Sequence, residues 1–273
     1  MVKRFFEKEF IWVLVVFLIA CGEEDIEVEQ FLGDVFLNSQ EAVETFGFND
    51  YTQIDGSLII ADTSSASNLI VDLEKLSKLK TITGDLIIRG NSSLQNLHGL
   101  ENLRSVEGDL LISDNNALKN TLGVDGIITM GGDLKIVENH SLDEVNMNNL
   151  ELISGDVMLA SHIRSLELKS LERISGDFYI LRTRIPNLMG LVSLRSVGRH
   201  FEISNNTLLV DLDGLENFQT IGEILVIFSN SSLVDFCALR NIAKSGGLNE
   251  GKYSNSLNQN NPSVSSIAEG NCR

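Results

Sequence analysis

The side chains able to do chemistry in this sequence are few, and their spacing favours structural over catalytic roles. The three cysteines, Cys21, Cys237 and Cys272, form no CxxC pair, and the four histidines form no HExxH pattern. No GxSxG, P-loop or GxGxxG motif occurs. We therefore expect no enzyme activity, no cofactor and no bound metal.

The first cysteine follows a segment with the features of an export signal. A basic start precedes the apolar run 10–20, which is shorter than the roughly 20 residues that a membrane-spanning helix needs. The run ends in Leu18-Ile19-Ala20-Cys21, which resembles a bacterial lipobox. The resemblance implies that 1–20 is a signal peptide and that Cys21 carries lipid; the alternative is an incidental cysteine behind a buried strand.

An acidic stretch follows the expected lipid attachment site. Glu23, Glu24 and Asp25 resemble the surface-export signal of Bacteroidetes-type lipoproteins, although an acidic tether also serves solubility. We expect 21–33 to be the lipidated cysteine and its tether. The protein would then sit on a bacterial outer membrane through its lipid anchor, exposed at the cell surface.

The remaining two cysteines form an even pair in an exported chain, where disulfides persist. A bond between Cys237 and Cys272 would close a loop of about 35 residues and stabilise the fold by roughly 3–4 kcal/mol. We predict this disulfide, and we expect it to hold the polar C-terminal segment 243–273 in place as a cap.

Charge and composition exclude other classes of protein. The formal net charge is −17, and lysines and arginines form no cluster in the sequence, which argues against binding nucleic acid. With 43% hydrophobic residues and two prolines the chain is globular rather than disordered.

A repeat in the sequence indicates the elements that must position these residues. A phrase that ends in apolar–any–apolar recurs eight times at intervals of about 24 residues, which indicates a solenoid whose coils bury their apolar sides by stacking. Five copies carry Gly-Asp, and weaker copies begin at Ile54, Val197 and Ile221: the strong ones are ITGDLII (82–88), VEGDLLI (106–112), MGGDLKI (130–136), ISGDVML (153–159) and ISGDFYI (174–180). We number the coils one to eight from Ile54.

Each coil is expected to contain one short strand and several tight corners. Apolar residues alternate through the phrase and then recur every third position, which suits neither a long helix nor a long strand. We predict a mainly β fold, a right-handed β-solenoid of about eight coils over 54–242. Short helices would cap it in 34–53, where Asn38 is the expected N-cap, and in 243–273.

Three residues beyond the phrase lies a column of asparagines. Its side chains can bond backbone groups that would otherwise lack partners inside the coil. Thr63, His162 and Thr183 are expected at this position in the other coils. The predicted asparagine ladder is Asn91, Asn115, Asn139, Asn206 and Asn230.

The whole phrase resembles a known family. The segment GDLIIRGNSSLQNLHGLENLRSVEGDLLI is similar to the receptor L-domain repeat, a relative of leucine-rich repeats, over roughly residues 50–245. The resemblance implies extracellular recognition or cell-surface structure, without catalysis. Coil seven departs from the pattern, with Arg199-His200 in place of Gly-Asp.

Outward positions of the strands carry more apolar residues than a water-facing sheet usually has. They indicate either a recognition face centred on Met158, Tyr179 and Leu181 or merely β-propensity and coverage by a loop or partner chain. The candidate binding face is Ile87, Leu111, Met158, Tyr179, Leu181 and Phe228.

The aspartates of the phrase form a second column. Each could accept a backbone N–H where its strand begins, or the column could hold cations, which usually need six or more oxygens. We favour the backbone role for Asp85, Asp109, Asp133, Asp156 and Asp177.

These observations favour a lipid-anchored surface protein that binds an extracellular protein or glycan. The alternatives are a structural envelope protein without a specific ligand and, less favoured, an enzyme acting on polysaccharide. A bare strand face would favour binding, and a covered one would favour the structural role.

Overall fold

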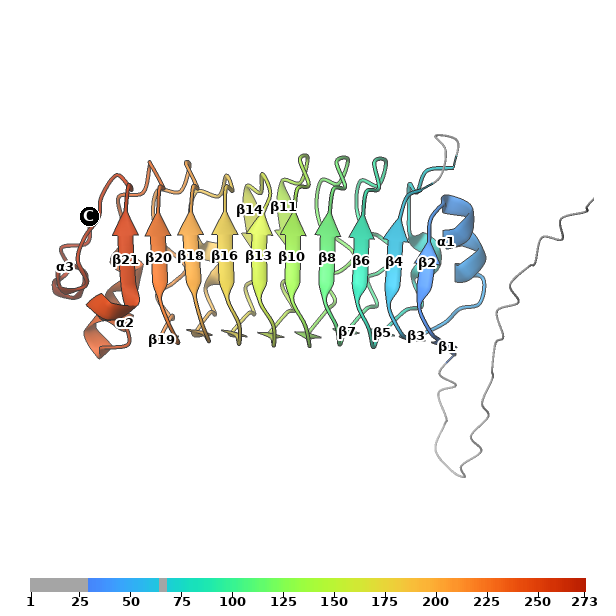
Figure 1. Ribbon diagram of the computed structural model, residues 1–273, viewed down its shortest axis with the longest axis horizontal. Coiled ribbons are helices and arrows are strands. Elements are labelled where there is room, and N and C mark those ends of the chain that lie inside the picture. The colour runs from blue at the N-terminus through green and yellow to red at the C-terminus, as the bar shows by residue number, and fades with distance from the viewer. Residues whose placement is uncertain (1–28, 64–67) are drawn as a thin grey trace, which may run out of the picture.

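The alternating phrase of each coil forms a short strand, and strands of successive coils stack in parallel (Figure 1). The structure is a computed structural model that describes residues 29–63 and 68–273. The mainly β solenoid with few helices is confirmed. The longer sheet has ten strands in chain order: β2 (Val35–Leu37), β4 (Leu58–Ala61), β6 (Leu86–Arg89), β8 (Leu110–Ser113), β10 (Leu134–Val137), β13 (Val157–Ala160), β16 (Phe178–Leu181), β18 (Phe201–Ser204), β20 (Leu225–Phe228) and β21 (Tyr253–Ser256).

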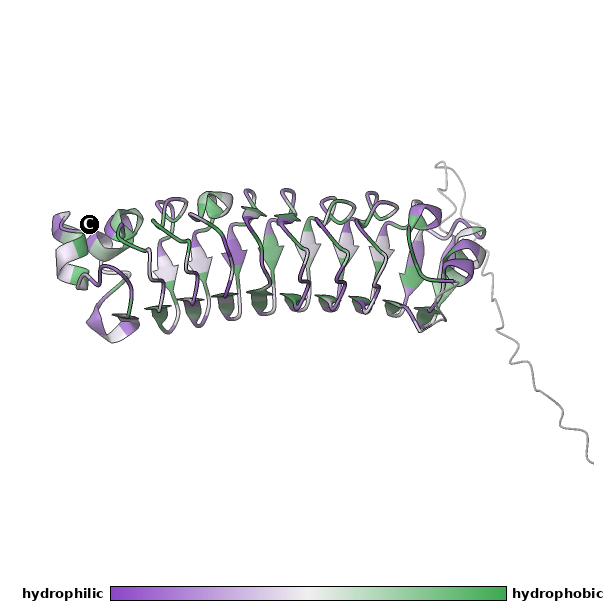
Figure 2. Ribbon diagram, turned by 90° about the horizontal axis from the view of Figure 1, so that it is seen from above, coloured by the Kyte–Doolittle hydropathy of each residue, from purple (hydrophilic) through white to green (hydrophobic). Residues whose placement is uncertain are grey.

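A second parallel sheet is built from the residues just before each turn into the first. In each coil a turn of about three residues joins a strand of this second sheet to a strand of the first, so both sheets belong to one column of coils. Figure 2 shows this column from above, with α-helices at its two ends. The nine strands of the second sheet are β1 (Gln30–Leu32), β3 (Gln53–Asp55), β5 (Thr81–Ile82), β7 (Ser105–Val106), β9 (Thr129–Met130), β12 (Leu152–Ile153), β15 (Arg173–Ile174), β17 (Ser196–Val197) and β19 (Thr220–Ile221).

The third side of the column is irregular except in coils four and five. There the apolar spacing shortens from three to two, as in Val145–Met147 and Leu166–Leu168, and the chain forms the paired strands β11 (Glu144–Asn146) and β14 (Ser165–Glu167). Period two is the period of a strand, so the local sequence accounts for this small sheet. Elsewhere this side has turns and the 3₁₀ helices η1 (Glu74–Leu76), η2 (Met189–Leu191) and η3 (Cys237–Leu239).

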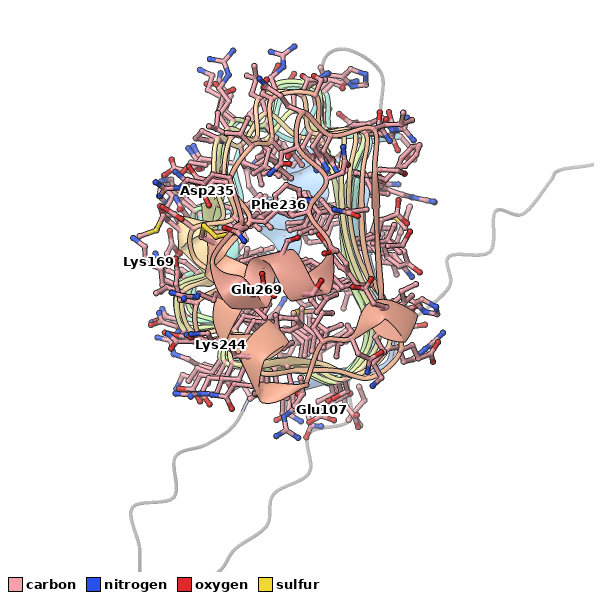
Figure 3. All side chains as sticks on the ribbon, turned by 90° about the vertical axis from the view of Figure 1, so that its left-hand side faces the viewer. Glu107, Lys169, Asp235, Phe236, Lys244 and Glu269 are labelled. Atoms are coloured by element: carbon pink, nitrogen blue, oxygen red, sulfur yellow. A yellow bond between two sulfur atoms is a disulfide. The ribbon has the colours of Figure 1, made fainter. Side chains whose placement is uncertain are left out.

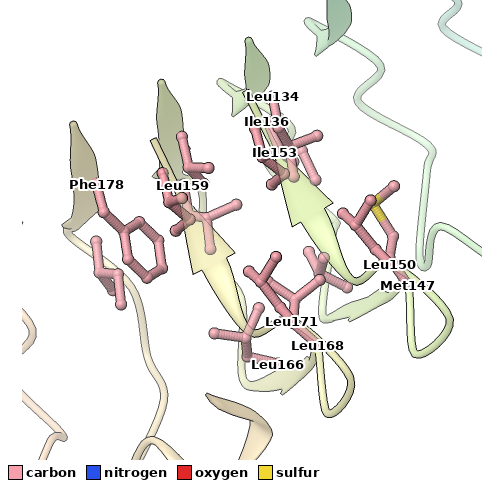
Figure 4. Packing of buried hydrophobic residues seen from close by; sticks show 14 of the residues in the cluster. Leu134, Ile136, Met147, Leu150, Ile153, Leu159, Leu166, Leu168, Leu171 and Phe178 are labelled. Carbon is pink, nitrogen blue, oxygen red and sulfur yellow. The ribbon is translucent and has the colours of Figure 1, made fainter. Parts of the chain in front are cut away.

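A single continuous core runs through the column. The inward residues of every coil are buried, for example Leu134 and Ile136 of β10 and Leu159 of β13 (Figure 4). Burying one such side chain stabilises the fold by about 1.5–3 kcal/mol. In coils six and seven the inward column carries aromatic rings, and Phe178 and Phe201 stack with centroids 4.7 Å apart.

Helices close the two ends. Helix α1 (Gln40–Gly47) is capped by Ser39, whose hydroxyl accepts the Ala42 N–H at 3.2 Å, so the expected cap Asn38 is wrong by one residue. At the other end α2 (Arg240–Ser245) stops at Gly246 in the left-handed conformation, and α3 (Val264–Glu269) packs beside it (Figure 3). Among the described residues no helix has the length and apolar character needed to span a bilayer.

The column extends further at both ends than the expected 54–242. Strands β1 and β2 add a coil before Ile54, within residues assigned to the tether (21–33) and the N-terminal cap (34–53). Strand β21 pairs with β20 and adds another within the assigned C-terminal cap (243–273), where the 3₁₀ helix η4 (Glu250–Lys252) precedes it. The first extra coil begins with its own Gly33-Asp34 turn.

Candidate functional site

The outer face of the ten-stranded sheet is bare over the part of the chain that the structure describes. In Figure 1 its strands face the viewer, and no helix crosses them. Among the described helices, α1 contacts this sheet at β2, at the end of the column. The face is thus open to solvent, which the sequence arguments treated as the observation favouring binding over a purely structural role.

The candidate face residues occupy two outward columns on this surface. Ile87, Leu111, Met158, Tyr179 and Leu181 are half-buried, because each side chain lies against those of the neighbouring strands, and Phe228 is 38% exposed. The in-register pairing places Met158 opposite Tyr179 on one side and Lys135 on the other. Ile87 and Leu111 are neighbours in the same column, whereas Phe228 lies two strands beyond Leu181.

Polar groups at the centre of this face are held by the aspartate column. The Lys135 Nζ donates to Asp133 Oδ2 at 2.7 Å, and the Tyr179 hydroxyl donates to Asp177 Oδ2 at 3.1 Å. Burial raises the pKa of Tyr179, and the Asp177 hydrogen bond raises it further. Burial alone would raise the pKa of Asp133, but hydrogen bonds from Lys135 and the Asp156 N–H outweigh it and lower this pKa.

The aspartates join successive coils where the long strands begin. Each Oδ1 accepts the backbone N–H of the next aspartate along the chain, at 2.7–2.8 Å from Asp85 through Asp177. A methyl group on Gly155 would overlap Asp133 Oδ1 and the Gly132 backbone, which accounts for glycine before the aspartate. These bonds are the backbone role favoured from the sequence.

The column ends in a charged network in coil seven. Asp177 is buried and its Oδ1 accepts the His200 backbone N–H at 3.0 Å, so His200 occupies the aspartate position. Its carboxylate also contacts the His200 ring and the Arg199 guanidinium, each at 3.2 Å. Burial would raise the pKa of Asp177, but the hydrogen bonds from His200 and Tyr179 and the charge of Arg199 lower it.

The aspartate column is not among the groups of three potential metal ligands within the described residues. The set of three potential metal ligands found within that part of the chain is Asp235 with Cys237 and Cys272. The two sulfurs are bonded to each other, with a Cα–Cα distance of 5.1 Å, and so cannot act as thiolate ligands (Figure 3). The predicted disulfide is therefore present, whereas Cys21 and the signal segment 1–20 lie outside the described residues.

The asparagine column joins coils in the opposite direction at the other end of the same strands. Asn115 Oδ1 accepts the Asn91 backbone N–H at 3.0 Å, and Asn115 Nδ2 donates to the Ile88 carbonyl at 2.8 Å. The same pattern links Asn139, Asn206 and Asn230 to their neighbours, and all five predicted asparagines are fully buried. The column continues to Asn258, which the sequence interpretation did not include.

Coils one and five take a shorter path at this corner. Asn139 donates its backbone N–H to the Ser161 hydroxyl at 3.1 Å, so Ser161 occupies the column, and the predicted His162 is exposed. In coil one, Asp62 rather than Thr63 donates to Asn91. Thr183 does occupy its predicted place, with its N–H 2.8 Å from Asn206 Oδ1.

The short corner of coil five interrupts two regular features. Strand β13 pairs with β16 over three residues instead of four, so Ala160 lacks a ladder partner on that side. No hydrogen bond links Ser161 to Thr183 within the described part of the chain. A hollow of about 110 Å³ opens here beside the outer face; it is lined by Glu138, Asn139, His140, Ala160, Ser161, His162 and Arg182.

A second hollow lies on another side of the column. It has a volume of about 350 Å³, with Ile128 40% exposed among mostly polar walls. Asp125 and Glu101 bond nearby backbone N–H groups, and Arg104 donates to the Glu101 carbonyl at 2.7 Å. The sequence gives no signal for either hollow, because each is lined by residues of several coils that meet only once the coils are stacked.

Comparison with known proteins supports the architecture. The receptor L domain family model matches residues 51–121, about a quarter of the chain. No curated protein and no solved structure matches the chain. The family match and the stacked parallel strands together fit an L-domain- or leucine-rich-repeat-like solenoid, and the match suggests a role in ligand recognition in general.

Proposed function

We propose that this chain is a lipid-anchored recognition protein of a bacterial cell surface, and that it binds a protein or glycan through the outer face of its ten-stranded sheet. The observation that carries the proposal is the bare face itself. Over the described residues it presents Met158, Tyr179 and Leu181 side by side on consecutive strands without an element covering them.

The chemistry of this face suits a contact surface. Apolar and aromatic side chains contribute most of the binding energy at many interfaces, and polar groups around them give orientation. Here Lys135 and Tyr179 are held by Asp133 and Asp177, so their positions are set before a partner arrives. Prearranged side chains lose less conformational entropy on binding.

The attachment to a membrane rests on the sequence. The lipobox-like Leu18-Ile19-Ala20-Cys21 and the acidic stretch after it support lipidation and outward display. Cells expressing the full chain would be labelled with radioactive palmitate. We expect Cys21→Ser to abolish labelling and Cys237→Ser to retain it; equal labelling of both variants would contradict the lipid anchor.

The recognition proposal can be tested on the chain from Gly22 onward, which retains every described strand and helix. Glycan arrays and pull-downs from the extracellular medium would be run with the parent protein, Tyr179→Ala and Met158→Ala. The matched control is Met189→Ala, because Met189 is 51% exposed but lies in η2, on another side of the column. We expect a loss of at least about fivefold in affinity for the two face variants alone, since interface anchors are each worth more than about 1 kcal/mol. Binding that survives in both face variants would place the site elsewhere.

A further inference from the structure

The hollow at coil five brings together two histidines that lie 22 residues apart in the sequence. His140 follows the asparagine of coil four, and His162 follows Ser161 in the shortened corner of coil five. Their ring centroids are 5.9 Å apart, and both rings line the hollow. His98 and His200 lie in other coils and contact carboxylates instead.

The hydrogen bonds of His140 fix the orientation of its ring. Nδ1 lies 2.8 Å from Asn116 Oδ1 and 3.2 Å from the Glu138 carbonyl oxygen. A carbonyl oxygen can only accept, so Nδ1 carries the hydrogen and donates it. The lone pair of the neutral ring is then on Nε2. This arrangement, in which one ring nitrogen donates to an oxygen and the other is available, is the usual state of a metal-bound histidine.

The separation of the rings suits one shared ion. Zinc binds imidazole nitrogen at about 2.0–2.1 Å, which places the centroids of two rings on one tetrahedral zinc about 5 Å apart. The observed 5.9 Å lies close to that distance. His162 is exposed, so its side chain can move toward His140, and water can complete the coordination of the ion.

We propose that His140 and His162 bind a divalent transition-metal ion such as Zn²⁺ in this hollow, with the negative charge of Glu138 nearby on the rim. This inference goes beyond the proposed recognition role and does not depend on it. Arg182 also lines the hollow, and its positive charge opposes a cation. The same charge would favour an anion. Removing Arg182 should therefore strengthen the binding of a cation and weaken the binding of an anion.

The test is the binding of zinc chloride to the full chain in detergent micelles, measured by titration calorimetry. We expect one zinc ion per chain. His140→Ala and His162→Ala should each lower the affinity at least about tenfold, because removing a direct ligand costs no less than the 10–100-fold loss typical of outer partners. Asn116→Ala, which releases the His140 ring, should weaken binding by about tenfold.

Three further variants complete the design. His98→Ala is the control, because His98 is an exposed histidine bonded to Glu101, and it should leave zinc affinity unchanged. Glu138→Gln should weaken binding and Arg182→Ala should strengthen it. Unfolding curves without zinc should match for all variants of exposed residues. Equal zinc affinity in the parent, His140→Ala and His162→Ala would overturn the proposal, and so would loss of binding in Arg182→Ala.

Discussion

The buried asparagine column and the outward columns of the outer face lie within a few residues of each other in every coil. The asparagine column repeats one residue type, whereas the outward columns change from coil to coil. Asn91, Asn115 and Asn139 repeat the same side chain and the same hydrogen bonds through coils two to four. Over the same stretch the face presents Ile87, Leu111 and then Lys135.

The difference has a physical origin. A buried polar side chain must satisfy every group around it, so few residues fit, and one choice repeats from coil to coil. A solvent-facing position is satisfied by water and tolerates many residues. Uniform columns therefore report how the coils stack, and variable columns are where a particular ligand can be specified.

The strongest way to break this comparison is to remove one member of the uniform column. Asn115→Ala would leave the Asn91 N–H and the Ile88 carbonyl buried without those partners. Each such group costs about 1–3 kcal/mol, so we expect a loss of about 4 kcal/mol in urea unfolding. Asn102→Ala, which removes one exposed bond to the Ser77 carbonyl, should cost under about 1 kcal/mol. Similar losses for the two variants would contradict the structural role of the column.

The C-terminal coil tests whether the asparagine column keeps this end of the protein folded without the disulfide between Cys237 and Cys272. The double variant Cys237→Ser, Cys272→Ser removes the bond that spans 35 residues, and we expect a loss of about 3 kcal/mol. Limited proteolysis should then cut first within 248–273, while coils two to four resist. The parent protein treated with a reductant should behave alike; cleavage spread evenly along the chain would argue against a local effect.

Acid should weaken the second uniform column at Asp177. Its pKa lies below the ordinary value in the folded protein, so its ionised form stabilises the fold above about pH 4, and this contribution is lost as pH falls through the folded pKa. Asp177→Asn should cost about 2 kcal/mol at pH 7, since it weakens hydrogen bonds to an ionised group. Measured from pH 6 down to pH 2, the variant should lose less stability than the parent. Parallel pH profiles would show that Asp177 is not responsible.

Backbone strain beside the asparagine column offers a smaller test. Leu257 precedes Asn258 with φ +54°, whereas Gly90 holds the matching place before Asn91 with φ +68°. A left-handed conformation costs a non-glycine residue about 1 kcal/mol, so Leu257→Gly should raise the free energy of unfolding by up to that amount. Gly90→Leu should lower it by about as much. Changes of the same sign in the two variants would show that φ at this corner is not the cause.

The smallest effect should come from the variable face. Met158 and Leu159 are consecutive in β13, but Met158 faces outward and is half-buried, whereas Leu159 is 1% exposed. We expect Met158→Ala to change stability by about 0.5 kcal/mol and Leu159→Ala to cost about 3 kcal/mol. Chemical unfolding of both variants measures the contrast, and a large loss from Met158→Ala would mean that the face contributes to the core.

The coils could be predicted because their signals are local and repeated. The Gly-Asp turn, the alternating strand and the three-residue spacing of leucines each fix one corner of the path. The extra coil before coil one, with its Gly33-Asp34 turn, follows the same rule and could have been found from it. The last coil could not, since Tyr253 and Asn255 replace the usual apolar pair of the inward strand positions.

The features that escaped sequence analysis depend on differences between neighbouring coils. Counting three residues from Leu159 selects His162, but coil five omits the left-handed residue that precedes Asn139 in coil four, so Ser161 enters the column instead. The pair of His140 and His162 follows from this one-residue change. No motif in the sequence marks it, because the two rings meet only once the coils are stacked.

Each regular coil offers a carboxylate to the coil after it and an amide to the coil before it. The surfaces between coils two, three and four are therefore interchangeable, since every junction needs the same two side chains. A gene in which the stretch encoding 91–114 is duplicated would encode a longer rod whose new junction is already complementary. The length of the rod can thus change by whole coils, and each added coil brings new outward positions that can differ in sequence.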